Sequence, residues 1–106
     1  ADGSKKTLVI DTKALPILPD VEEYASMGLI PGGAYRNREF AAKSGYISTA
    51  EPGGGSGFDP QTSGGLLAAV PADEAEEILL ELSESALSCA MIGEVTDREN
   101  HALEIR

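Results

Sequence analysis

The sequence predicts an α+β domain in which helices pack on a mixed sheet. Stretches rich in β-formers and stretches with helical apolar spacing follow in the order strand, helix, irregular segment, strand, helix, strand, strand. The chain has 106 residues, of which 42% are hydrophobic and 25% charged, and this fits one folded unit with a modest core. We therefore expect residues 1–106 to form a single domain.

The first half of the chain predicts one strand and one helix. Thr7–Ile10 is rich in β-formers and reads as the first strand. A helix is expected to begin at Asp20, because Asp20 and Glu23 have the spacing of a capping box, and Gly28 is well placed to end it. The segment from Tyr35 to Tyr46 fits either a loop or a short helical turn.

The second half predicts a strand, a helix and a closing pair of strands. Gly64–Val70 is almost continuously apolar, as expected for a central strand buried on both faces. Asp73 is expected to cap a helix. Its apolar face should contain Ala75, Ile78, Leu79 and Leu82. Ser88–Val95 reads as the next strand, Thr96–Asn100 as a polar turn and Ala102–Ile105 as a hairpin partner.

The charge balance argues against nucleic acid as a partner. Eighteen acidic residues against eight basic ones give a net charge of -10, whereas a polyanion needs a basic footprint. Arg36, Arg38 and Lys43 nevertheless form a small basic region with Glu39 as the acidic residue nearby. This region would either attract a phosphate group or form a solvated surface with ordinary ion pairs.

The sequence gives little support for a metal site, a catalytic nucleophile or a membrane segment. Cys89 has no second cysteine or nearby histidine at metal-ligand spacing, and we expect it to be a buried strand residue. His101 has no evident acidic partner, and the carboxylates form no metal-binding motif, so no catalytic or metal-ligating residue is assigned. No apolar run approaches the roughly 18 residues of a membrane span, and ADGSKK does not resemble a signal peptide. We expect a cytoplasmic protein without membrane contact.

The most site-like segment is DPQTSGGLL, from Asp59 to Leu67. Asp59 and Pro60 favour a turn, and Thr62 and Ser63 place hydroxyl groups beside two glycines. The candidate phosphate-facing residues here are Thr62, Ser63, Gly64 and Gly65. The alternative is a strand-entry turn whose hydroxyl groups satisfy local backbone atoms.

Three segments carry a family resemblance. DPQTSGGLL, the upstream GLIPGGAYRNRE from Gly28 to Glu39, and AMIGEV from Ala90 to Val95, with HALEIR after it, resemble the C-terminal domain of selenophosphate synthetase (selenide, water dikinase). A nine-residue match is far more specific than a generic glycine pattern. The resemblance implies a layered arrangement like that of the C-terminal domain of aminoimidazole ribonucleotide synthetase, partly ferredoxin-like.

The resemblance also implies a function for the complete enzyme. Such an enzyme uses ATP, selenide, water and magnesium to make selenophosphate, and its catalytic Cys, Lys and metal-binding Asp residues belong to regions that this chain lacks. The chain alone should therefore be inactive. Its implied partners are the N-terminal catalytic domain and, because the parent is expected to be a homodimer, a second subunit. Gly32, Gly33, Arg36 and Asn37 would join Thr62–Gly65 at the interdomain ATP and substrate cleft, or both segments would simply fix the domain interface.

One segment departs from the family pattern. Residues 51–57, EPGGGSG, read as a flexible linker where a longer, largely helical insertion is expected. The segment would be a natural loop or an engineered shortening. Two other functions therefore stay open: a ligand- or partner-binding module of a related ATP-dependent biosynthetic or maturation protein, and an engineered stand-alone scaffold.

Overall fold

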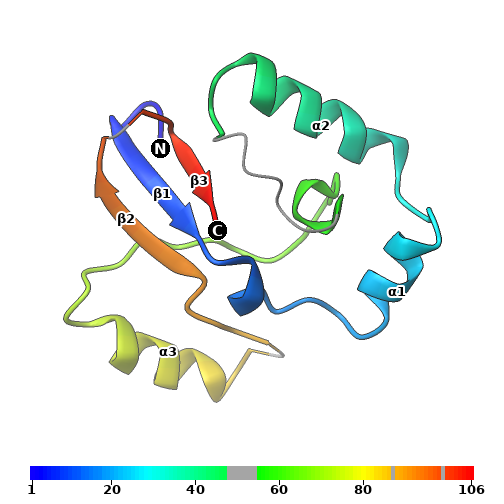
Figure 1. Ribbon diagram of the computed structural model, residues 1–106. Coiled ribbons are helices and arrows are strands. Elements are labelled where there is room, and N and C mark those ends of the chain that lie inside the picture. The colour runs from blue at the N-terminus through cyan, green and yellow to red at the C-terminus, as the bar shows by residue number, and fades with distance from the viewer. Residues whose placement is uncertain (48–54, 87, 99) are drawn as a thin grey trace.

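The computed structural model describes residues 1–47, 55–86, 88–98 and 100–106, and a mixed sheet of three strands lies at its centre (Figure 1). The central strand is β1 (Lys6–Ile10). It pairs antiparallel with β2 (Gly93–Asp97) and parallel with β3 (Leu103–Ile105). The predicted α+β class and mixed sheet are confirmed.

The sheet has two faces of different burial. Leu8 lies opposite Val95 on one side and Leu103 on the other, so three apolar side chains share one face. All three side chains retain some exposure, and Val95 is 48% exposed. Thr7 and Val9 project to the opposite face, where both are buried. The strongest packing therefore lies on the Thr7 and Val9 face.

Three α-helices lie outside the sheet. They are α1 (Val21–Ser26), α2 (Gly32–Lys43) and α3 (Ala75–Ser83). Two 3-10 turns, η1 (Thr12–Ala14) and η2 (Gly55–Phe58), complete the described elements. In Figure 1, α1, α2 and η2 lie to one side of the sheet and α3 lies beneath it. The segment that we left open between loop and helical turn is the greater part of α2.

The chain after α2 returns to the sheet. The rings of Phe40 and Tyr46 stack at a tilt with centroids 6.0 Å apart. The Leu103 amide donates to the Tyr46 carbonyl at 2.6 Å, and Ile47 forms a parallel bridge with Leu103. The outer edge of β3 is therefore partly covered. The outer edge of β2 has no strand beside it within the described residues.

An ion pair joins β1 to β2. Lys6 Nζ lies 2.7 Å from Asp97 Oδ1. The hydrogen bond from Lys6, together with its positive charge, lowers the pKa of Asp97 below the ordinary value of 3.8. The pair connects the first residue of β1 to the last residue of β2.

The two predicted helix caps are wrong, although both helices exist. Asp20 has a left-handed backbone with φ +66°, and its side chain makes no capping hydrogen bond. The residue preceding α3 is Glu74 rather than Asp73, and it too makes no side-chain cap. The predicted end of α1 at Gly28 agrees with the structure, because Gly28 adopts φ +83°, which glycine tolerates.

The prediction of a central strand at residues 64–70 is also wrong. The segment forms no helix or strand, and all its side chains are exposed. Leu66 is 102% exposed and Leu67 65%. An apolar run shows that a segment is suited to burial, but it does not determine which strand the segment pairs with.

The C-terminal strands pair differently from the prediction. Of the expected strand 88–95, only Gly93–Val95 belongs to β2. The strand then continues to Asp97, within the segment expected to be a polar turn. The hairpin is wrong, because β3 lies on the other side of β1 instead of beside β2. Cys89 lies outside any strand and is half-buried.

The linker-like stretch at 51–57 lies largely outside the described residues; its last residues, 55–57, belong to η2. Within the described ranges, no helix has the length and apolarity needed to cross a membrane.

Candidate functional site

The two motif segments that sequence reasoning selected lie against each other. Asn37, in the second turn of α2, donates from Nδ2 to the Phe58 carbonyl at 3.0 Å. Pro60 lies against Gly33: a Cβ built on Gly33 would be 2.7 Å from Pro60 Cγ. The first two turns of α2 therefore pack against Phe58, the last residue of η2, and against Pro60. We call residues 59–65 the motif loop.

The motif loop is folded by its own backbone. The Gln61 amide donates to the Asp59 carbonyl at 2.9 Å, and Ser63 adopts a left-handed conformation with φ +58°. The Thr62 and Ser63 side chains are exposed, and within the described residues neither hydroxyl has a hydrogen-bond partner. Their hydroxyl groups are therefore available to a molecule outside this chain.

The four motif glycines divide into two pairs. Gly33 and Gly64 are crowded, because a Cβ at Gly33 would meet Pro60 and one at Gly64 would lie 2.5 Å from Gln61 Oε1. At Gly65 an added Cβ would meet nothing within 4 Å, and at Gly32 its nearest neighbour would be Arg36 Nη1 at 4.0 Å. Neither of the two open glycines has a positive φ. Crowding by the rigid Pro60 ring explains Gly33. At Gly64 the closest atom is the end of the flexible Gln61 side chain, so crowding is a weaker reason there, and it leaves Gly32 and Gly65 unexplained.

The electrostatics of this region favour an anion at the start of α2. No acidic residue lies in the first turn of α2, and Pro31 provides no side-chain cap. The first amide groups of the helix therefore lack a capping side chain, and the positive end of the helix dipole lies at the same place. Arg36 is exposed in the second turn. Lys43, at the far end, forms an i,i+4 ion pair with Glu39 at 2.5 Å. The basic region predicted from sequence is therefore strongest near Gly32 and Arg36.

An apolar hollow borders the other side of the motif loop. Its volume is about 710 Å³. Its walls come from the connection after β1 (Leu15, Pro16, Ile17, Leu18), from α1 and the turn after it (Val21, Tyr24, Ala25, Leu29, Ile30, Pro31), and from the loop region (Gly57, Asp59, Gln61, Gly65). Gly65 thus lies both in the motif loop and in the wall of this hollow.

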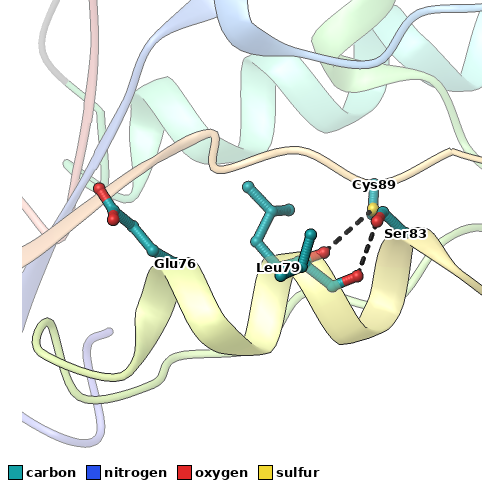
Figure 2. A pocket seen from close by; sticks show the side chains of 5 residues that line it. Glu76, Leu79, Ser83 and Cys89 are labelled. Atoms are coloured by element: carbon teal, nitrogen blue, oxygen red, sulfur yellow. Dashed lines mark hydrogen bonds between the residues drawn. The ribbon is translucent and has the colours of Figure 1, made fainter.

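A second hollow, beside α3, holds the cysteine but lacks an activating base. Its volume is about 340 Å³, and it is lined by Glu76, Leu79, Leu80, Ser83 and Cys89. Figure 2 shows the Glu76 carboxylate at the opposite end from Cys89, whose thiol lies 4.0 Å from the Leu79 carbonyl oxygen. Ser83 donates to the Leu80 carbonyl at 2.6 Å. Without a neighbouring base, the thiol is not arranged as a nucleophile.

The remaining titratable groups form no second centre. Among the described residues, no group of three or more His, Cys, Asp or Glu side chains is placed to hold a metal ion. The His101 ring contacts the Gly45 carbonyl through Nδ1 at 3.1 Å, next to the covered edge of β3. Its position supports a structural contact rather than catalysis.

The chain belongs to a known family of enzyme domains. The family model for the AIR synthase related protein, C-terminal domain, matches residues 1–106. The mixed sheet with surrounding helices agrees with this assignment.

Several similar proteins are named selenide, water dikinase. Selenide, water dikinase 2 of Peptoclostridium acidaminophilum is 36% identical over 105 residues, covering 97% of this chain and 30% of the relative. Selenide, water dikinase of Pelobacter propionicus is 44% identical over 92 residues, covering 78% of this chain and 25% of the relative. The enzyme of the same name from Clostridium botulinum strain Eklund 17B is 33% identical over 108 residues, covering 100% of this chain and 31% of the relative.

These alignments have two consequences. The chain spans about 30% of the length of the curated relatives that it matches. The alignment with the C. botulinum protein also covers this whole 106-residue chain in 108 positions. That relative therefore has no long insertion where residues 51–57 stand, and for it the expected helical insertion is wrong.

Proposed function

We propose that this chain is the non-catalytic C-terminal domain of a selenide, water dikinase, and that it supports the cleft in which the complete enzyme binds ATP and its other substrates. The start of α2 and the motif loop form the proposed cleft-facing surface. Its members are Gly32, Gly33, Arg36, Asn37, Thr62, Ser63, Gly64 and Gly65. The catalytic N-terminal domain is the proposed partner, within a homodimeric parent.

The observation that carries the proposal is that hydroxyl groups without hydrogen-bond partners in the described chain occur on the same surface as uncrowded glycines. Thr62 and Ser63 present hydroxyl groups that the described part of the chain does not use. At Gly32 and Gly65 neither the backbone conformation nor a close neighbour requires glycine, and the missing side chain leaves space beside the backbone. A phosphate group needs such donors and such close approach to backbone amides. Arg36 adds a positive charge to the same region.

Magnesium fits this chain poorly. The described residues hold no cluster of carboxylate or other ligating side chains, and magnesium in phosphoryl-transfer sites is held by carboxylates together with substrate phosphates. We therefore assign no magnesium ligand to this chain. In the proposal, its own residues orient the substrate and help to close the cleft.

A structural role for both segments is the main alternative. Gly33, Gly64 and the hydrogen bond from Asn37 serve internal packing and would be needed even if no ligand approached. The two readings differ at Thr62 and Ser63, because internal packing does not use their hydroxyl groups.

The test is a double substitution, Thr62→Ala with Ser63→Ala, in the complete parent enzyme. We expect kcat/KM for ATP to fall about 5- to 150-fold, corresponding to roughly 1 to 3 kcal/mol for lost hydrogen bonds. The thermal unfolding midpoint should stay the same, because neither hydroxyl bonds within the described chain.

Ser85→Ala provides the matched control, since Ser85 is an exposed serine in the turn after α3. It should leave both activity and unfolding unchanged. If the double variant keeps normal kinetics, the motif loop is a structural turn and the cleft role must be abandoned.

A further inference from the structure

The apolar hollow beside the motif loop has the composition of an interface core. Among the described residues that line it, Asp59 is the only charged one, although the chain has a net charge of -10. Aliphatic side chains and the Tyr24 ring form most of its walls. Depletion of charge together with an aromatic residue is typical of the central part of a protein interface.

The large apolar side chains of this hollow are poorly covered by the chain itself. Leu18, Tyr24 and Leu29 are 74%, 52% and 66% exposed, and all three line the hollow. The helix α1, which forms one of its walls, contains no buried residue. A group of exposed, large apolar side chains on one surface marks a site of interaction.

The length of the relatives indicates what covers the hollow. The family model describes a C-terminal domain, and the match with the P. acidaminophilum enzyme covers 97% of this chain but 30% of the relative. The chain exposes 8068 Å², whereas a monomer of its mass typically exposes about 5,600 Å². The excess is large enough for an interface between domains, which typically covers about 600 to 1,500 Å².

The hollow is also continuous with the surface that we assign to the cleft. Asp59, Gln61 and Gly65 belong to the motif loop and line the hollow as well. Pro31, which precedes α2, lines it too. A group of side chains that fills the hollow would therefore contact the motif loop directly and help to hold it in place.

We propose that the hollow is the anchor point of the catalytic domain, and that apolar side chains of that domain fill it. The proposal rests on the proposed function, because it takes the chain as one domain of a complete selenide, water dikinase. It adds the surface by which the two domains hold together, and this surface is apolar, whereas the cleft-facing surface carries hydroxyl groups and Arg36. The anchor would set the position of the motif loop relative to the catalytic residues of the other domain.

Hydroxyl-radical footprinting of the complete parent enzyme, without nucleotide, measures the cover directly. Leu80 is the internal reference, because it is 68% exposed and lines the hollow beside α3 instead (Figure 1). We expect Leu18 and Leu29 to be oxidised several-fold more slowly than Leu80, since side chains in the core of an interface lose contact with water. A photo-crosslinking residue at position 18 should join a peptide of the catalytic domain, and one at position 80 should not.

Leu18→Asp and Leu80→Asp form a matched pair of variants in the same enzyme. A carboxylate is disfavoured in a dry apolar contact, so Leu18→Asp should loosen the anchor and raise the oxidation rate of Leu29 several-fold, towards that of the reference leucine. Leu80→Asp should leave the rate of Leu29 unchanged. Because both leucines are exposed in this domain, neither change removes core packing from the domain itself.

Four results would overturn the proposal. Oxidation of Leu18 and Leu29 at the rate of Leu80 would show that the hollow stays open in the enzyme. Protection that appears only when ATP is added would make a nucleotide the occupant. A position 18 that does not cross-link to the catalytic domain, or a Leu18→Asp variant in which Leu29 stays protected, would exclude that domain as the occupant.

The footprint and the kinetic test separate the two proposals. The double variant at Thr62 and Ser63 measures phosphate contact, whereas the footprint measures contact between domains. A slow oxidation of Leu18 with normal kinetics of the double variant would keep the anchor and remove the cleft role. Fast oxidation with impaired kinetics would do the reverse.

Discussion

Replacing Gly33 with alanine should separate the motif loop from α2. A Cβ at this position would stand 2.7 Å from Pro60 Cγ and 3.0 Å from Pro60 Cβ. Carbon atoms attract best at about 3.5 to 4.0 Å, so Pro60 would have to move by about 1 Å. Gly32 provides an internal control, because a Cβ there would have Arg36 Nη1 as its nearest neighbour, at 4.0 Å.

The two substitutions should change stability in opposite directions. Both gain helix propensity, up to about 1 kcal/mol, because alanine restricts the unfolded chain and favours the helix. Gly33→Ala also overpacks the contact with Pro60, which typically costs about 1 to 3 kcal/mol. We therefore expect Gly33→Ala to be less stable than Gly32→Ala by about 1 to 3 kcal/mol, with Gly32→Ala equal to or above the parent chain.

Urea denaturation of the three proteins measures the difference, provided that their m-values agree. Backbone amide shifts of residues 58–65 should move in Gly33→Ala and stay in place in Gly32→Ala. If the two variants agree in stability within about 0.5 kcal/mol, which is the usual range for surface substitutions, Pro60 is not seated on Gly33. The geometry proposed for the motif loop would then be refuted.

Three further predictions concern the core, the activity and the pH response. Val9 is 5% exposed and Leu80 68% exposed; Val9→Ala should therefore cost about 2 kcal/mol in denaturation experiments, and Leu80→Ala less than about 0.5 kcal/mol. The purified chain should consume no ATP when selenide and magnesium are supplied, since it lacks the catalytic residues that the family resemblance implies; turnover that survives removal of contaminants would contradict this. Because Lys6 lowers the folded-state pKa of Asp97 below 3.8, the pair stabilises the fold above that pH and loses its effect as the pH falls through the lowered pKa. Asp97→Asn should therefore flatten the dependence of stability on pH below about 4, and an unchanged slope would show that the pair contributes nothing.

Local sequence signals predicted α1, α3 and the first strand because those features depend on neighbouring residues. β-formers at Thr7–Ile10 match β1, and glycine at position 28 matches a left-handed end of α1. The caps failed for a local reason too. Asp20 itself adopts the left-handed conformation instead of the extended one typical of an N-cap, and its side chain makes no hydrogen bond to the helix amides.

Strand pairing could not be predicted in the same way, because it depends on residues far apart in the chain. Residues 102–105 follow β2 closely, yet β3 pairs with the far side of β1, through the register of Leu8 with Leu103. Residues 64–70 have the composition of a buried strand and remain exposed. Periodicity identifies a segment that can pair, while its partner is set by topology and by which edge is open.

The candidate site was found by a different kind of signal. No spacing rule connects residues 32–37 with residues 59–65. Local residue types marked residues 59–65, and the family resemblance added residues 32–37. The structure brings the two segments together through Gly33, Pro60 and the hydrogen bond from Asn37. This contact explains why two distant motifs belong to one surface. It does not explain the open glycines or the unbonded hydroxyl groups on the same surface. Packing within the chain involves Gly33, Gly64 and Asn37. For the open glycines and the unbonded hydroxyl groups, our proposal is a molecule that approaches from outside.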